Sequence, residues 1–166
     1  MKHIMRRRFL KQLLGLAAVA GLAGCGFQLR GQAALPFSAA FVTAAPASNV
    51  GNALRRALTS QQKLAATVEA APVRITLDRE AYSKTILALS GGGKVREYRL
   101  EYRVWLSVAN ATGKTVVEPT EIHLSNDFSY SDAQVLAKEA EEASLNRAME
   151  QDALRQIMRR LSYLKL

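Results

Sequence analysis

Cys25 is the residue whose side chain and neighbours together point to one specific reaction. It is the only cysteine of the chain and directly follows Leu22-Ala23-Gly24. Small residues before a nucleophilic thiol resemble a lipobox, in which a peptidase grips an extended backbone. This predicts that Cys25 carries a diacylglyceryl group, becomes the mature amino terminus and anchors the chain in a lipid leaflet. The alternative is a free thiol, either buried or awaiting a partner.

The segment before Cys25 has the organisation of a secretory signal peptide. Its apolar run, Leu13–Ala23, has eleven residues. A helix rising ~1.5 Å per residue would cover about half of a ~30 Å hydrocarbon core with this run, which is too short to span it. We therefore expect residues 1–24 to be removed as a signal peptide. The Arg6-Arg7-Arg8 string fits a Sec signal and a twin-arginine signal equally well.

Much of the positive charge lies in this removable segment. Five of the 23 basic residues and none of the 14 acidic residues precede the apolar run and Cys25. The rest of the chain then has 18 basic and 14 acidic residues, and its net charge is +4 instead of +9. The high charge of the whole chain therefore does not indicate a nucleic-acid partner.

Few residues of the mature chain could carry out catalysis. With Cys25 acylated there is no thiol, and His123 is the one histidine after the signal peptide. This excludes Cys/His nucleophile schemes and cysteine zinc sites. Asp127 and Ser129 lie near His123, but alternation along a strand explains all three. We expect no enzymatic activity, no metal and no cofactor apart from the covalent lipid.

Residues 25–38 are expected to form a lipidated tether and residues 39–166 a single domain. Alternation of apolar and polar residues predicts a four-stranded sheet. Its strands are expected to cover residues 39–45, 73–89, 94–108 and 115–130. A phase slip between Tyr82 and Leu89 predicts a bulge. The third strand places Tyr102 and Val104 toward the core, and its other face carries a charged ladder.

Helical periodicity predicts two helices on one face of that sheet. Ser48 or Asn49 caps the first, whose apolar residues recur every three or four positions over residues 50–58. Ser131 and Gln134 predict a capping box for a long second helix. Its apolar residues are expected to pack on the sheet: Leu136, Ala140, Ala143, Leu154, Ile157, Leu161 and Leu164. The expected fold class is α+β, a two-layer sandwich of two helices on a four-stranded, mostly antiparallel sheet.

Positive charge is concentrated around the turn between the second and third strands. Gly91-Gly92-Gly93 and the following Lys94 lack the Ser/Thr and helix of a phosphate-binding loop, so they predict a hairpin turn. Arg96, Arg99 and Arg103 follow within the next strand. Two explanations remain open: cross-strand pairing with glutamates, or contact with an anionic partner. On a lipoprotein facing the periplasm, lipopolysaccharide is an abundant anion whose phosphates suit Lys and Arg donors.

Three short motifs occur in order along the mature chain. They are Cys25-Gly26-Phe27-Gln28-Leu29-Arg30-Gly31, the glycine-rich turn leading to Arg96-Glu97-Tyr98, and Asp127-Phe128-Ser129-Tyr130 followed by Ala137-Lys138-Glu139. Together they resemble the lipopolysaccharide-assembly lipoprotein family LptE. The resemblance implies the same fold of two helices packed with a four-stranded sheet.

The resemblance also implies a function without catalysis. LptE proteins plug the large outer-membrane β-barrel LptD, support its assembly, and bind lipopolysaccharide during delivery to the outer leaflet. Lys94, Arg96 and Lys138 are the positions implied to contact lipopolysaccharide. Gly26, where an Asp would resemble an inner-membrane retention signal, favours a lipid-anchored, periplasm-facing place in the outer membrane. The alternative is a lipoprotein accessory subunit of a phospholipid or solute transport system.

Replacing Cys25 tests the lipid anchor. Cys25→Ala should abolish lipid attachment and leave the signal peptide uncleaved by the lipoprotein peptidase, because no other thiol can accept the diacylglyceryl group. Metabolic labelling with palmitate measures this directly. Label retained by the variant would contradict the lipobox assignment.

Overall fold

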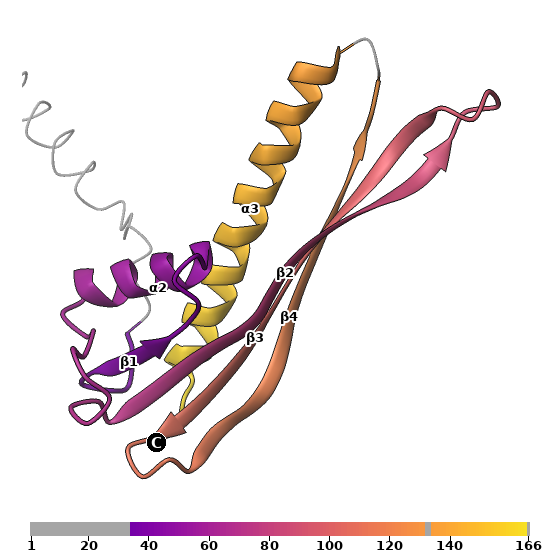
Figure 1. Ribbon diagram of the computed structural model, residues 1–166. Coiled ribbons are helices and arrows are strands. Elements are labelled where there is room, and N and C mark those ends of the chain that lie inside the picture. Colours follow the sequence, from indigo (N-terminus) through magenta and orange to yellow (C-terminus); the bar gives the residue numbers. More distant parts are fainter. Residues whose placement is uncertain (1–33, 132–133, 166) are drawn as a thin grey trace, which may run out of the picture. The chain divides into compact units, whose positions relative to one another are not determined.

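The computed structural model describes residues 34–131 and 134–165, and every structural statement below concerns these residues. The signal peptide and Cys25 lie outside them. The order of elements is strand, helix, three strands, helix, as expected (Figure 1). The strands are β1 (Ala40–Thr43), β2 (Val73–Leu89), β3 (Val95–Asn110) and β4 (Thr115–Ser129), and the helices are α2 (Asn49–Ser60) and α3 (Val135–Ser162).

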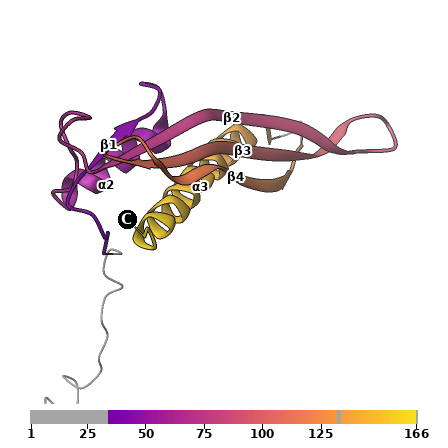
Figure 2. The same cartoon turned by 90° about the horizontal axis from the view of Figure 1, so that it is seen from below.

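The four strands form one sheet in the order β1-β2-β3-β4. The parallel pair β1–β2 joins two antiparallel pairs, so the sheet is mostly antiparallel as predicted. Because β1 pairs only with Val73–Thr76 at the start of β2, the rest of β2 has β3 as its single strand neighbour. The long β2–β3 hairpin extends past the ends of β4 and α3 (Figure 2).

The core lies between the sheet and two helices on the same side of it (Figure 1). Helix α2 begins as predicted: the Ser48 hydroxyl accepts a hydrogen bond from the Gly51 backbone N–H at 2.8 Å, which satisfies one unpaired amide of the first turn. Its buried stripe includes Leu54 and Leu58. On β3 the predicted alternation is confirmed, and its buried residues are Leu100, Tyr102, Val104, Leu106 and Val108.

The predicted phase slip in β2 is confirmed, and an earlier irregularity accompanies it. The pairing with β3 shifts between Asp78 and Ala81 and again around Leu87. Arg79 lies at the first shift with a φ of 49°, and its guanidinium is 4.0 Å from the centre of the Trp105 ring. An unmatched residue reverses which face the following side chains occupy.

The predicted cap of the long helix and the predicted packing of its first part are wrong, whereas packing is confirmed for Leu154, Ile157, Leu161 and Leu164. Helix α3 begins at Val135 with no side-chain hydrogen bond at its cap, so the capping box of Ser131 is not formed. Leu136 is 82% exposed, and Ala140 and Ala143 are exposed as well. The buried residues come later, at intervals of four: Met149, Ala153, Ile157 and Leu161.

The neighbours of this first part of α3 explain the difference. There the sheet presents Lys84, whose amino group pairs with Glu142 of α3 at 2.5 Å. An ion pair therefore joins helix and sheet where apolar packing was expected. Alanine side chains are also small, so burying them contributes little free energy to folding.

Packing extends further toward the amino terminus than the expected start of the domain at residue 39. Leu35 and Phe37, placed in the tether by the sequence, are buried in the core cluster. The Lys63 amino group donates hydrogen bonds to the backbone carbonyls of both residues, to Leu35 at 3.0 Å. These contacts attach residues 34–38 to the domain.

Val104→Asp tests the orientation of the sheet. The side chain is fully buried, so the substitution places an unpaired charge in the core and should cost several kcal/mol, about the whole stability of a small domain. Thermal unfolding followed by circular dichroism should show no cooperative transition. Arg103→Gln on the opposite, exposed face is the control and should melt close to wild type. The reverse result would show that the two faces are wrongly assigned.

Candidate functional site

The turn of the β2–β3 hairpin places Lys94 at its outer end. The Gly93 N–H donates to the Ser90 carbonyl at 2.9 Å, and the Lys94 N–H donates to the Ser90 hydroxyl at 3.1 Å. Gly93 has a φ of 77°, a conformation that glycine adopts without strain. This confirms the hairpin turn, and no helix follows it as it would in a phosphate-binding loop.

Arg96 and Lys138 each contact a residue at the end of β4. The Arg96 carbonyl accepts a hydrogen bond from the Tyr130 N–H at 2.8 Å. The Lys138 amino group, from the first turn of α3, lies 3.3 Å from the Ser129 hydroxyl. Lys94 directly precedes β3 and is two residues before Arg96. We call Lys94, Arg96 and Lys138 the basic end.

The three cations of the basic end differ in their surroundings. Arg96 is exposed, and its guanidinium makes no ion pair with any residue that the structure describes. The Lys138 side chain is only 14% exposed and pairs with Glu141 at 2.8 Å. An anion approaching Lys138 must therefore compete with a carboxylate on the same helix.

A cluster of aromatic side chains, which was not predicted from the sequence, lies next to the basic end. The Tyr98 ring stacks on Phe128 with centroids 5.8 Å apart and meets the edge of Tyr130 at 5.2 Å. The Lys84 amino group lies 4.3 Å from the centre of the Tyr98 ring. These contacts hold β3, β4 and the residues around Arg96 in fixed positions. The recurrence of aromatic residues near the ends of both strands was the available signal.

The hairpin also carries exposed aliphatic side chains next to the basic end. Ile86, Leu87 and Leu89 are 56%, 42% and 57% exposed. The pairing of β4 with β3 ends at Glu97, so beyond that point only β2 and β3 pair with each other. We call residues 86–96 the hairpin tip. The phase slip in β2 was the sequence signal for this change of environment.

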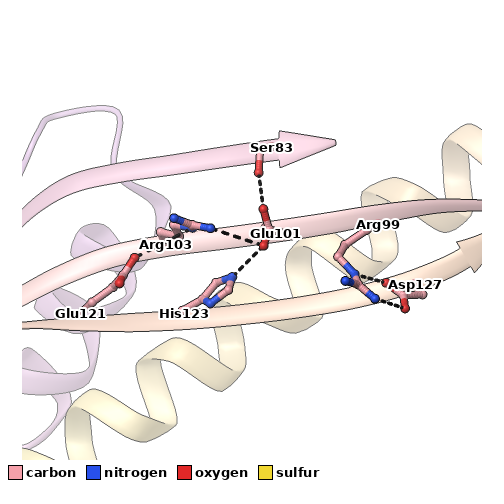
Figure 3. Close-up of polar contacts among 7 residues, drawn as sticks. All are labelled: Ser83, Arg99, Glu101, Arg103, Glu121, His123 and Asp127. Carbon is pink, nitrogen blue, oxygen red and sulfur yellow. Dashed lines mark hydrogen bonds and ion pairs between the residues drawn. The ribbon is translucent and has the colours of Figure 1, made fainter. Parts of the chain in front are cut away.

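The open face of the sheet confirms cross-strand pairing for two of the predicted cations, Arg99 with Asp127 and Arg103 with Glu121, and Arg103 also pairs along β3 with Glu101. The Glu101 carboxylate accepts hydrogen bonds from Ser83 at 3.1 Å and Arg103 at 3.4 Å, and lies 3.0 Å from His123 (Figure 3). Arg99 donates two hydrogen bonds to Asp127, at 2.7 and 2.8 Å. Hydrogen bonds from Ser83 and His123 lower the pKa of Glu101.

The residues that might have formed a catalytic group have other partners. His123 lies against Glu101, Asp127 binds Arg99, and Ser129 lies against Lys138. In residues 34–131 and 134–165, no group of three or more His, Cys, Asp or Glu side chains could hold a metal ion. No helix in these ranges is both long and apolar enough to cross a membrane.

A polar network joins the bulged part of β2 to both helices. The Tyr82 hydroxyl donates to Glu150 of α3 at 2.7 Å, and Asn49 of α2 donates to the same carboxylate oxygen at 2.9 Å. The Tyr102 hydroxyl donates to Glu80 at 2.9 Å. Burial raises the pKa of both phenols, so both remain protonated donors. The Glu80 Oε2 atom is buried without a hydrogen-bond partner among the described residues, whereas its Oε1 atom accepts from Tyr102.

Arg99→Gln tests the electrostatics of the open face. Hydrogen bonds from Arg99 lower the pKa of Asp127, so the variant should raise that pKa toward its ordinary value. A lowered pKa in the folded state contributes stability above the unfolded-state pKa, and this is lost as pH falls through the folded-state value. The variant should therefore lose less stability than wild type on acidification below about pH 4. NMR titration of the carboxyl carbon measures the pKa; Arg103→Gln should leave it unchanged, and an unshifted value in Arg99→Gln would contradict the pairing.

Comparison with known proteins places this chain in one family. The model of the family LptE, described as lipopolysaccharide-assembly, matches residues 38–161. The LPS-assembly lipoprotein LptE of Photorhabdus laumondii is 29% identical over 161 residues, which cover 95% of this chain and 87% of that protein. The LPS-assembly lipoprotein LptE of Yersinia enterocolitica is 30% identical over 163 residues, covering 95% and 77%.

Solved structures share the fold. The solution structure of an uncharacterized lipoprotein B from Nitrosomonas europaea has a TM-score of 0.71 and 36% identity, covering 82% of this chain and 90% of that chain. Rare lipoprotein B from Shewanella oneidensis has a TM-score of 0.64 at 21% identity, covering 74% and 93%, a likeness of fold alone. The match over residues 38–161 and the two similar lipoproteins lead to one conclusion: this chain belongs to the LptE family of lipopolysaccharide-assembly lipoproteins.

Proposed function

We propose that this protein binds lipopolysaccharide at the basic end and, as a plug, supports assembly of the LptD β-barrel. Membership of a lipopolysaccharide-assembly family supports the general role. The observation that supports the binding site is that Arg96, through its backbone carbonyl, and Lys138, through its amino group, both contact residues at the end of β4, and that Lys94 precedes Arg96 by two residues. We infer that these residues, which are distant in sequence, contribute to one cationic surface.

The chemistry of this surface suits phosphate groups. A guanidinium donates two parallel hydrogen bonds to a phosphate, and an ammonium supplies a compact charge. Arg96 is exposed and makes no ion pair among the described residues, so phosphate binding there breaks no existing pair. Lys138 would exchange Glu141 for the phosphate, which lowers its expected contribution.

The open face of the sheet suits the inside of a barrel. Its charged side chains are paired with each other across β2, β3 and β4 (Figure 3). The interior of an outer-membrane barrel is polar, so a face whose charges are already paired can lie against it without leaving a charge unsatisfied. This argument supports the role of a plug.

The proposed role needs no catalytic residue and no cofactor beyond the lipid on Cys25. Phosphate recognition and barrel support are both binding functions. The lipid would hold the protein in the outer membrane, as the Gly26 position favours, with the domain facing the periplasm. LptD, lipopolysaccharide and the outer-membrane lipid are the proposed partners.

Charge reversal at the basic end tests the proposal. The triple variant Lys94→Glu, Arg96→Glu and Lys138→Glu should bind lipopolysaccharide far more weakly, because each charge-assisted contact contributes roughly 1.5 to 3 kcal/mol. Binding of the lipidated protein in detergent should also weaken with added salt, since exposed charges are screened over ~10 Å. Far-UV circular dichroism and co-purification with the barrel should stay near wild type.

A matched control has the same charge change elsewhere. Arg56, Arg147 and Arg159 are exposed and lie away from the hairpin, on α2 and α3, and the control variant replaces all three with Glu. It should keep wild-type binding. Equal loss in both variants would indicate attraction by net charge alone, and equal retention would remove the basic end from the site. Co-purification with an inner-membrane ATPase in place of the barrel would favour the transport-accessory alternative.

A further inference from the structure

The hairpin tip exposes more aliphatic surface than its own fold requires. Ile86, Leu87 and Leu89 are each more than two-fifths exposed and lie within four residues. Leu89 lies beyond the last pair of β3 with β4, at Glu97, where the hairpin is two-stranded. Ile86 pairs with Tyr98, which still has Phe128 of β4 as its partner, and its side chain is exposed all the same. A cluster of exposed aliphatic residues at the end of a sheet indicates a surface that another molecule covers.

The charges around Ile86, Leu87 and Leu89 indicate which kind of molecule would cover them. Residues 81–96 contain no acidic side chain, whereas Lys94 and Arg96 lie on the strand opposite the aliphatic residues. Leu89 pairs directly with Val95, between the two cations. The hairpin tip therefore combines an aliphatic strand with a cationic strand. Its complement is an amphiphile that carries hydrocarbon next to negative charge.

The pairing of β2 with β3 is irregular where the aliphatic and cationic side chains of the hairpin tip lie. Ile86 pairs with Tyr98 and Ala88 pairs with Glu97, so Leu87 has no partner on β3. A second shift follows between Ala88 and Leu89 and leaves Arg96 without a partner on β2. Such irregular pairing disrupts the regular alternation of side chains between two faces, and flexible hydrocarbon chains can adapt to an irregular surface of this kind.

We propose that Ile86, Leu87 and Leu89 contact the acyl chains of lipopolysaccharide while Lys94 and Arg96 hold its phosphates. The proposal rests on the proposed function and extends it from the phosphates to the hydrocarbon. The hairpin tip is then the element that keeps the acyl chains of a bound molecule out of water. A second copy of this chain is the alternative occupant, and the test separates it.

The experiment compares intact lipopolysaccharide with the same molecule after chemical removal of its acyl chains. The tip variant is Ile86→Thr, Leu87→Thr and Leu89→Thr, because threonine removes apolar area and keeps a high strand propensity. The lipidated protein in detergent is used throughout. The control variant is Leu64→Thr with Tyr163→Thr, two exposed apolar residues outside the hairpin.

Wild type and the control should bind intact lipopolysaccharide at least about tenfold more tightly than the deacylated molecule, as expected for several buried aliphatic groups. The tip variant should bind intact lipopolysaccharide about tenfold more weakly than wild type and should not distinguish the two molecules. Circular dichroism and binding of deacylated lipopolysaccharide, which depends on the cations, should be unchanged and show that the hairpin is intact.

Each contrary result has a separate meaning. Equal binding of both molecules by wild type, or a tip variant that still distinguishes them, overturns the acyl contact and leaves phosphate binding in place. Failure of wild type to bind lipopolysaccharide overturns the proposed function and this inference with it. Self-association that the tip variant abolishes, with unchanged lipopolysaccharide affinity, assigns the hairpin tip to a second copy of the chain.

Discussion

The β2–β3 hairpin is longer than the layer that covers it, and the rest of the structure depends on this mismatch. At one end, α2, β1 and the second half of α3 enclose an aliphatic core around Tyr102 and Val104. Toward the other end these elements stop, and aliphatic packing is replaced by the Lys84–Glu142 ion pair and the rings around Tyr98. Stability and binding are thus divided between the ends of one hairpin, because only one end can be buried.

Irregular pairing of β2 with β3 changes which β2 side chains face the helices. Before the shift at Asp78, the alternate residues Val73, Ile75 and Leu77 face the core. After it, Tyr82 and Lys84 face the helices, and each finds a polar or aromatic partner there: Tyr82 meets Glu150, and Lys84 meets Glu142 and Tyr98. A strand without these shifts would direct the same side chains to the open face. The bulges therefore decide which residues reach α3.

Neighbouring cations on β3 have different roles because of which strand lies opposite them. Arg99 pairs with Asp127 and Arg103 with Glu121 across to β4, and Arg103 also pairs with Glu101 along β3 (Figure 3). Arg96 lies where β4 ends, so no carboxylate of a third strand is opposite it. The end of β4 thus separates the charges that hold the sheet together from those that can meet a ligand.

The sequence alone determined the fold class, the order of elements along the chain, a cap at Ser48 or Asn49 and the core-facing residues of β3, because period-two alternation and caps are local signals. It also indicated the family through short ordered motifs. Only the tertiary structure decided that the start of α3 stays exposed, that Arg99 is paired while Arg96 is exposed, and that Arg96 and Lys138 each contact a residue at the end of β4. These facts depend on where strands end relative to one another. Helical periodicity places Leu136 on the same face as buried residues, but it cannot show whether the opposing layer extends far enough to cover it.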